Sequence, residues 1–286
     1  MTSIATKSDF DSSSKRFERF SKLVKDEIGV RLSLNKRVMV ESRLRRRMTQ
    51  LNLGSVDDYF RYLFDEGRLV EELDVIFDAV TTNKTDFFRE PDHFAILADV
   101  IVPERLKRRK ANGRASMFKF WSAAASSGME AYTTAMVLAQ YEERAAPFEW
   151  GILGTDINLK MLERCREAIF DTAEIAPVPA SLRTKYLMEG TGGRKGQWRV
   201  VPKLRSRTRF EKLNLLGANY PVDRDIDVIF LRNVLIYFDA VDQATVIERM
   251  ISHLAPHGHL IVGHSESMIV RQPGLTQIAP AVFCKD

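Results

Sequence analysis

The alternation of short apolar segments with helical segments from residue 117 onward is the feature that most constrains the fold. The stretch MFKFWSAA (residues 117–124) has the composition of a buried strand, and a helix through Gln140 follows it. The same pairing recurs in EWGILGTD with LKMLERCREAIF and in DVIFLRN with DQATVIERMISHLA, and GHLIVGHSE and PAVFCKD add strands. Nearly continuous apolar strands that alternate with helices are typical of a doubly wound α/β fold with a parallel sheet.

The first hundred residues have a different pattern, in which apolar residues recur at helical spacing. One stripe contains Phe17, Phe20, Leu23 and Val24, and a second contains Val40, Leu44, Met48 and Leu51. We therefore predict a helical domain over residues 1–95 and an α/β domain over residues 96–286. Between about residues 185 and 216 the strand–helix rhythm breaks, which predicts a small antiparallel β insertion in the second domain.

Composition limits the class of protein. The chain has 286 residues, of which 45% are hydrophobic, so it can bury a substantial core. No apolar run reaches the ~18 residues that a membrane span requires, and the polar N-terminal stretch lacks the apolar core of a signal peptide. Cys165 and Cys284 are the only cysteines and match neither zinc nor disulfide spacing. We expect a cytoplasmic protein without a bound metal.

The net charge of +5 favours an anionic partner, but RNA, anionic lipid and an acidic protein surface remain open.

The turn after the first strand of the α/β region has the position of a nucleotide site but lacks its glycines. It contains only Gly128, with neither G-x-G-x-x-G nor a Walker lysine. Glu130, in the first turn of the following helix, places a negative charge where a phosphate would otherwise lie. Asp156 closes the second strand, where a carboxylate commonly accepts hydrogen bonds from ribose hydroxyls. These residues favour a ligand that has a ribose and a positive group but no phosphate, such as S-adenosylmethionine.

Both carboxylates also have simpler interpretations. Asp156 has the position of an N-cap for the next helix, and Glu130 has that of a side chain that compensates the helix dipole. The stretch TTNKTDFFREPDHF (residues 81–94) is likewise compatible with a helix end and a turn in which Phe87 and Phe88 pack in the core.

Six motifs together resemble the chemotaxis receptor methyltransferases of the CheR family. In chain order they are TTNKTDFFRE, WSAAASSGMEAY, GTDIN, KLNLL, FLRNVLIYFD and GHSES, and the resemblance covers about residues 17–283. It implies an N-terminal helical domain and a methyltransferase domain that uses S-adenosylmethionine and releases S-adenosylhomocysteine. It also implies a small antiparallel subdomain within that second domain.

The resemblance implies a role for individual residues. Arg89 is expected close to the reacting methyl group, Asp156 at the ribose, and Tyr237 near the reaction centre. Arg89 and Tyr237 are the candidate catalytic residues. The candidate cofactor-binding residues are Asn83, Thr85, Arg89, Glu130, Asp156, Asn214, Leu215, Arg232 and Asn233.

One motif departs from the family pattern. Family members usually read G-E-E-P-Y where this chain has Gly128-Met129-Glu130-Ala131-Tyr132. The second glutamate, which is the one expected at the cofactor, is retained. Loss of the first glutamate and of the proline predicts a looser start to the helix.

The chemistry needs no strong base. A side-chain carboxylate is already ionised at neutral pH, so it can accept a methyl group without prior deprotonation. His264, in GHSES, is the best candidate base near the motifs, although a structural role at a strand end is the favoured interpretation. The absence of an obvious base therefore favours carboxyl methylation over methylation of a hydroxyl group.

The partners implied by the resemblance are the cytoplasmic helices of methyl-accepting receptors. Arg43, Arg46 and Arg47 lie beside an apolar stripe and are candidate docking residues, with a solvated helix face as the alternative. Arg199 and the glycine-rich turn GTGGRKG resemble family members that also bind a receptor's C-terminal peptide as an added strand, although Glu189 replaces a basic residue of those members. We expect a monomer that neither binds nucleic acid nor inserts into membrane.

Two other functions compete with receptor methylation. A methyltransferase acting on nucleic acid would be expected to interleave aromatic residues with its basic ones, and the arginine-rich helix has none. A module that binds S-adenosylmethionine or its product with little catalysis is suggested by Met129 and Ala131. Turnover distinguishes that module from the enzyme.

Overall fold

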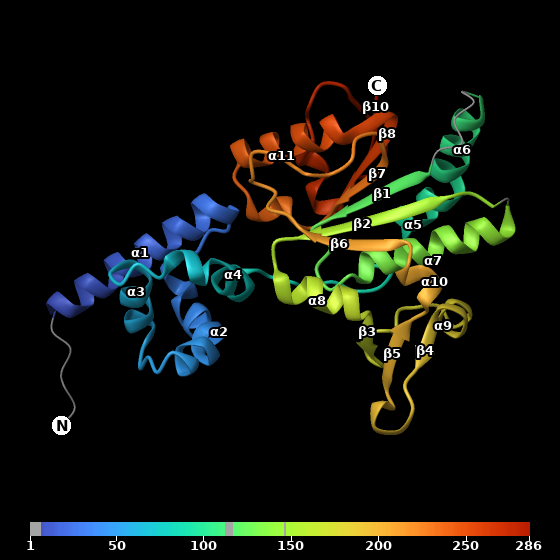
Figure 1. Cartoon of the computed structure of the whole chain (residues 1–286). Coiled ribbons are helices and arrows are strands. Elements are labelled where there is room, and N and C mark those ends of the chain that lie inside the picture. Colours follow the sequence, from blue (N-terminus) through green and yellow to red (C-terminus); the bar gives the residue numbers. More distant parts are fainter. Residues whose placement is uncertain (1–6, 112–116, 146) are drawn as a thin grey trace. The chain divides into compact units, whose positions relative to one another are not determined.

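The structure is a computed structural model that describes residues 7–111, 117–145 and 147–286 (Figure 1). Residues 1–6 of the predicted helical domain lie outside the described residues. The chain divides into two compact units. The first contains the residues up to Thr82 together with Tyr237–Asp239, and the second contains Asn83–Ile236 and Ala240–Asp286.

The first unit is helical, as predicted. Its helices are α1 (Lys7–Ile28), η1 (Leu34–Lys36), α2 (Arg37–Gln50), α3 (Val56–Phe64) and α4 (Leu69–Val80). The predicted stripes face inward, because Phe17, Phe20, Val40 and Leu44 are almost completely buried. The Phe20 ring lies 4.9 Å from that of Phe60 between centroids, which joins α1 to α3.

The second unit is built on a seven-stranded sheet with the strand order β6-β2-β1-β7-β8-β10-β9. The described pairings are parallel except for those of β10, which is antiparallel to both of its neighbours. The strands are β1 (Phe118–Ala123), β2 (Trp150–Asp156), β6 (Thr208–Lys212), β7 (Ile226–Leu231), β8 (Leu254–Val262), β9 (Leu275–Ala279) and β10 (Val282–Lys285). The predicted mixed α/β fold with a mostly parallel sheet is therefore confirmed.

Helices cover both faces of this sheet. Figure 1 shows α11 (Ala240–His253) on one side of the central strands and α7 (Met129–Arg144) and α8 (Leu159–Glu167) on the other. The chain enters the unit through α5 (Pro91–Ile96), a π-helical turn η2 (Leu97–Ile101) and α6 (Val102–Ala111). No helix of the described residues is both long and apolar enough to cross a membrane.

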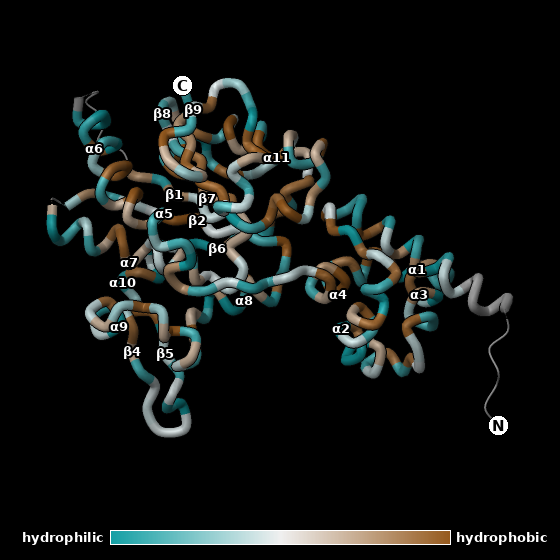
Figure 2. The backbone as a smooth tube through the Cα atoms, turned by 180° about the vertical axis from the view of Figure 1, so that it is seen from behind, coloured by the Kyte–Doolittle hydropathy of each residue, from teal (hydrophilic) through white to brown (hydrophobic). Residues whose placement is uncertain are grey.

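The core lies where the sheet and its helices meet. Each residue of β7 is buried, and α7 is buried along one continuous stretch from Ala131 to Ala139. The central strands are accordingly brown in the hydropathy view of Figure 2. A strand buried on both faces has no polar alternation, which is why VIFL, the part of β7 after Asp227, is one apolar run.

A separate three-stranded antiparallel sheet, with the order β3-β5-β4, is inserted in the second unit. Its strands are β3 (Ile169–Asp171), β4 (Leu187–Glu189) and β5 (Gln197–Val200), with α9 (Ala180–Tyr186) between β3 and β4. The turn GTGGRKG joins β4 to β5 through η3 (Gly192–Arg194), and the amide of Gly190 donates to the Gln197 carbonyl over 2.8 Å. This is the predicted hairpin rather than a phosphate loop.

The predicted bounds of the insertion, about 185–216, were wrong at both ends. The sheet begins earlier because Ile169–Asp171 pairs with Gln197–Arg199. It ends earlier because Thr208–Lys212 joins the central sheet beside β2, after a short helix α10 (Pro202–Arg205). Three residues of strand carry too little pattern to be recognised from sequence.

The two units meet at Thr82 rather than at the predicted residue 95. The segment that follows Thr82 packs into the core of the second unit. The Phe87 ring meets that of Phe170 edge-on at 4.9 Å, and the Phe94 ring lies 5.6 Å from that of Phe230. The helical pattern of residues 91–96 does not reveal this, because apolar spacing identifies a buried face but not the core that buries it.

A buried ion-pair network ties α6 to the sheet. Asp227 of β7 is fully buried and accepts hydrogen bonds from Arg105 at 2.7 and 2.9 Å, from Arg109, and from the Lys119 amide at 2.8 Å. A buried carboxylate is stable when several donors compensate its charge. Removal of the carboxylate leaves the buried arginines without a counter-charge, which destabilises the fold.

We expect Asp227→Ala to lower the free energy of unfolding by about 3 kcal/mol, because two arginines lose their buried counter-charge. Urea denaturation measures the change. The matched control is Asp223→Ala, whose side chain is 73% exposed and pairs with Lys119 at 2.9 Å. Removal of this exposed pair should cost less than about 1 kcal/mol. Equal losses in the two variants would contradict this account.

Candidate functional site

The predicted site residues follow the strands of the central sheet at their carboxyl ends. Asp156 closes β2, Arg232 and Asn233 follow β7, and Asn214 and Leu215 follow β6. In the strand order, β1 lies between β2 and β7. The chain runs from β1 to β2 and β6 on one side and then returns to β7 on the other side, so the order reverses at β1. The carboxyl edge at such a reversal is where open α/β sheets bind their ligands.

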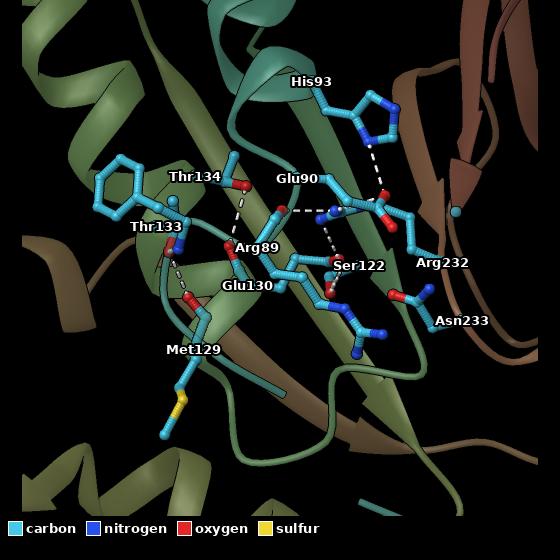
Figure 3. A network of polar contacts seen from close by, with 12 residues as sticks. Arg89, Glu90, His93, Ser122, Met129, Glu130, Thr133, Thr134, Arg232 and Asn233 are labelled. Atoms are coloured by element: carbon cyan, nitrogen blue, oxygen red, sulfur yellow. Dashed lines mark hydrogen bonds and ion pairs between the residues drawn. The ribbon is translucent and has the colours of Figure 1, made fainter. Parts of the chain in front are cut away.

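The centre of this edge is the side chain of Arg232, which is 1% exposed (Figure 3). Its Nη1 donates to Glu130 Oε2 at 3.0 Å, and its Nη2 donates to Glu90 Oε2 at 2.9 Å and to the Arg89 carbonyl at 2.5 Å. The guanidinium also lies over the rings of Phe94 and Phe230, at 5.6 and 5.3 Å from their centroids. One buried cation therefore joins the start of α7, the loop after β7 and the segment before α5.

The two carboxylates on Arg232 differ in their electrostatics. Burial raises the pKa of Glu130, although Arg232 and the hydroxyl of Ser122, which donates to Oε1 at 2.6 Å, oppose the rise. Burial also raises the pKa of Glu90, but the hydrogen bond and charge of Arg232 outweigh it, so the net shift is downward. Glu130 is thus the carboxylate whose negative charge is least compensated by the protein, and a cationic ligand group would stabilise it.

Asp156 joins two strand ends rather than capping a helix. Its Oδ2 accepts from the Ser126 amide at 2.8 Å, and its Oδ1 accepts from the Asn158 amide at 2.9 Å. The N-cap of α8 is Asn158, whose side chain accepts from the Met161 amide. The alternative in which Asp156 caps α8 is therefore excluded, and its carboxylate lies at the ends of β1 and β2.

The predicted cofactor-binding residues Asn214 and Leu215 follow a segment that is hydrogen-bonded to Asp156. The Leu213 amide donates to the Asp156 carbonyl at 3.0 Å, which fixes the start of the segment that follows β6. The side chain of Asn214 accepts from the Leu216 amide at 3.0 Å, and Leu215 is buried. The structure therefore brings Asp156, Asn214 and Leu215 together.

The segment 83–90 lies against the turn after β1. The Asn83 carbonyl accepts from the Ser126 hydroxyl at 2.9 Å, and the Phe88 amide donates to the Thr133 hydroxyl at 3.2 Å. Phe87 is buried, as its packing interpretation predicted. Thr85 and Arg89 are partly exposed on the same segment, and Arg89 donates to the Lys84 carbonyl at 3.1 Å.

Left-handed backbone conformations are concentrated at this edge. Non-glycine residues with positive φ include Phe88 (55°), Glu90 (54°), Ser126 (51°) and Asn233 (58°). Such conformations cost free energy and persist where surrounding contacts impose them, which is common at binding sites. Gly128 has a φ of 85°, and a Cβ there would lie 3.0 Å from the sulfur of Cys165, so this single glycine of the turn is required.

Glu266 is a site residue that the sequence interpretation missed. It is fully buried and accepts from the amides of Asn233 at 2.7 Å, Gly263 at 2.9 Å and Ile236 at 3.3 Å. A Cβ on Gly263 would lie 2.6 Å from the side-chain Nδ2 of Asn233 and 2.8 Å from Glu266 Oε2. The motif GHSES contains both residues, but only the fold shows that its glutamate holds the loop after β7.

Three other predicted positions have distinct surroundings. Tyr237 ends η4 (Leu235–Tyr237) and belongs to the helical unit, so its place at the reaction centre stays a prediction. His264, at the start of η5 (His264–Ile269), hydrogen-bonds Asp92 at 2.9 Å. Met129 is 3% exposed and packs in the core, and α7 begins at this residue despite the departure from the family motif.

The predicted docking arginines divide into two groups. Arg43 donates to the carbonyls of Ala79 at 3.0 Å and Thr81 at 2.9 Å, and Arg47 forms a forked ion pair with the buried Glu72. These two arginines have structural partners within the helical unit. Arg46 is exposed on α2.

Arg199 lies on β5 of the small sheet and is also exposed, with its Nε donating to the Glu167 carbonyl at 3.0 Å.

The geometry of the site fits S-adenosylmethionine better than a dinucleotide. Glu130 is a largely buried carboxylate, 12% exposed, at the start of α7, where a pyrophosphate would meet like charge. Asp156 supplies a second carboxylate at the next strand end, where ribose hydroxyls can donate to it. The protein therefore offers acceptors to a ribose and a negative charge to an ammonium or sulfonium group.

Comparison with known proteins gives the same result over nearly the whole chain. Residues 15–81 match the family model described as the CheR methyltransferase, all-alpha domain, and residues 83–282 match the CheR methyltransferase, SAM binding domain. The chain is 36% identical over 281 residues to chemotaxis protein methyltransferase 2 of Pseudomonas aeruginosa, covering 96% of this chain and 94% of the relative. It is 38% identical to the chemotaxis protein methyltransferase of Salmonella typhimurium, covering 96% and 92%.

We expect Glu266→Gln to weaken the affinity for S-adenosylmethionine about tenfold, because the glutamine NH₂ would face backbone donors that then lack an acceptor. Calorimetric titration measures the affinity, and thermal unfolding shows whether the fold persists. Glu248→Gln, a change on α11 outside the site, is the control and should bind like the wild type. Unchanged affinity in a folded Glu266→Gln protein would show that the loop does not depend on this carboxylate.

Proposed function

Because the chain belongs to the CheR methyltransferase family, and is therefore an S-adenosylmethionine-dependent methyltransferase, we propose that it methylates glutamate side chains of chemotaxis receptors. The product would be a glutamate methyl ester, which serves sensory adaptation by removing one negative charge from the receptor. The names of the relatives support the chemotaxis substrate. The observation that carries the proposal is the buried Glu130–Arg232 pair beside Asp156 at the carboxyl edge of the sheet.

Among the described residues, His264 is the one candidate base near the site motifs, and its contacts support a carboxylate acceptor. S-adenosylmethionine supplies a methyl group on a positively charged sulfur and leaves as S-adenosylhomocysteine when a nucleophile takes that methyl. A glutamate carboxylate is ionised at neutral pH, so the protein has no proton to remove and contributes mainly by orientation. His264, the candidate base, is instead engaged with Asp92.

In this proposal, different site residues bind the cofactor and orient the substrate. Asp156 accepts from the ribose hydroxyls, Asn214 and Leu215 flank the adenine, and Glu130 attracts the cationic end of the cofactor. Arg232 and Asn233 lie beside the methionine portion, while Asn83 and Thr85 contact the cofactor from the other side. Arg89 orients the incoming carboxylate, and Tyr237 donates a hydrogen bond to it.

Receptor docking is proposed to use the exposed basic residues. Arg46 is the docking candidate on α2 that projects into solvent, and Arg43 lies exposed beside it with two backbone acceptors. The receptor's methylation helices are rich in glutamate, so the contact would be ionic and weakened by salt. The small sheet, with Arg199 on β5, is the candidate site for a receptor C-terminal peptide added as a strand.

The rival function is a module that binds the cofactor or its product without turnover. Met129 and Ala131 suggest it, because they replace family residues at the start of α7. Both are buried in a regular helix whose next residue, Tyr132, donates to the Cys165 carbonyl at 2.8 Å. These contacts favour a helix start that is competent for catalysis.

We expect the protein to transfer radiolabelled methyl from S-adenosylmethionine to a receptor cytoplasmic fragment, with a base-labile product because the bond is an ester. Asp156→Asn should raise KM for S-adenosylmethionine about tenfold, because a hydrogen bond to a charged group becomes one to a neutral group. Glu163→Ala, which removes an exposed carboxylate of α8, should leave KM unchanged. A receptor fragment with its glutamates changed to alanine should take no label.

The same assay separates the competing functions. Cofactor binding by calorimetry without any label would favour the binding module, and base-stable label would indicate another acceptor group. A KM for the receptor fragment that does not rise with salt would contradict docking through Arg43 and Arg46.

We expect Arg89→Ala to lower kcat at saturating S-adenosylmethionine at least about tenfold, because the incoming carboxylate loses a charged partner. Arg271→Ala, which removes an exposed arginine near the C-terminus, is the control and should keep wild-type kcat. A wild-type turnover number for Arg89→Ala at saturating cofactor would remove Arg89 from the reaction centre.

A further inference from the structure

Two histidines and a glutamate converge beside the methyltransferase site. Glu90 precedes α5, His93 lies within it, and His264 begins η5 after β8. One ligand atom from each of the three side chains lies within 4.8 Å of the others. Residues far apart in sequence thus bring two imidazoles and a carboxylate to one point, and Figure 3 shows His93 and Glu90 facing one another above Arg232.

His93 is the member of this cluster that lacks an adequate partner. It is completely buried, and neither ring nitrogen forms a hydrogen bond with the described residues. Its Nδ1 lies 3.4 Å from Glu90 Oε2, but the two atoms do not form a hydrogen bond. Buried polar groups are nearly always satisfied, so an imidazole with two unused nitrogens indicates a ligand.

The protonation of His93 suits metal coordination. Burial, followed by the charge of Arg232, lowers its pKa to about 4. The ring is therefore neutral at pH 7 and retains a lone pair, which is the form that binds metal ions.

The second histidine is oriented in the manner of a metal ligand. The His264 ring lies 4.6 Å from that of His93 between centroids, and its Nε2 lies 2.9 Å from Asp92 Oδ2. Metal-binding histidines usually engage a carboxylate through the nitrogen that does not bind the metal. Asp92 occupies that position and leaves Nδ1 of His264 available.

The local charge is also suited to a cation. Glu90 and Asp92 bring two carboxylates to this point, and the guanidinium of Arg232 pairs with Glu90. The formal charge of these three groups is therefore −1, which favours a cation. Two imidazoles and one carboxylate with open positions suit Zn²⁺ and other late divalent transition metals rather than Mg²⁺ or Ca²⁺.

We propose that Glu90, His93 and His264 form a binding site for a divalent transition metal ion, with Zn²⁺ as the test ion, separate from the S-adenosylmethionine site. Coordination through Glu90 competes with its hydrogen bond from Arg232, which also holds Glu130. Metal binding should therefore weaken S-adenosylmethionine binding, and the cofactor should weaken metal binding by the same factor. The site is regulatory and supplies no group to methyl transfer.

The test titrates Zn²⁺ into the metal-stripped full-length protein against a chromogenic chelator. One ion should bind per chain, and the exposed variant His264→Gln should weaken its affinity at least about tenfold, since loss of even an orienting partner of a ligand costs 10- to 100-fold. His257→Gln, which removes an exposed histidine of β8, is the matched control and should bind as the wild type does.

Two further measurements keep the test independent of folding and of the methyltransferase reaction. Co²⁺ in place of Zn²⁺ should give visible bands of nitrogen and oxygen coordination in the wild type, and these should be lost in His264→Gln. A sulfur-to-cobalt charge-transfer band would assign binding to Cys284 and overturn the proposal, as would equal Zn²⁺ affinity in wild type and His264→Gln. Calorimetric affinity for S-adenosylmethionine that is the same with and without Zn²⁺ would overturn the proposed coupling.

Discussion

The buried guanidinium of Arg232 is the interaction on which the carboxyl edge of the sheet depends. It donates hydrogen bonds to Glu130, 102 residues away in sequence, to Glu90, 142 residues away, and to the Arg89 carbonyl. A buried charge is costly unless acceptors compensate it, so the three acceptors of the Arg232 Nη groups fix these segments together. The segment 83–90 and the start of α7 consequently share one anchor.

The same ion pair leaves part of the electrostatic cost of burying Glu130 uncompensated. Arg232 satisfies part of Glu130, but burial still raises the pKa of that carboxylate. A ligand that brings a positive group relieves the cost that the protein leaves in place. Glu266 stabilises the loop that contains Arg232 and Asn233. Its carboxylate accepts hydrogen bonds from backbone amides, including those of Asn233 and Gly263.

The helical unit has a comparable internal constraint. Glu72 is fully buried and is held by Arg47 and by the Tyr59 hydroxyl, which donates at 2.9 Å. A run of arginines on α2 therefore combines an internal structural role with an exposed charge at Arg46. A charge run in a sequence cannot distinguish these two uses, since both leave the same letters at the same spacing.

The sequence by itself determined the helical first unit, the mostly parallel sheet and the positions of the residues that follow its strands. Apolar periodicity is a local property, and parallel strands place their carboxyl ends at one edge, so these conclusions need no coordinates. The tertiary structure alone decided the boundary at Thr82, the pairing of Ile169–Asp171 with β5, and the partners of Arg232, Asp156 and Glu266. Each of these depends on contacts between residues far apart in the chain, where burial and hydrogen-bond geometry rather than spacing select the partner.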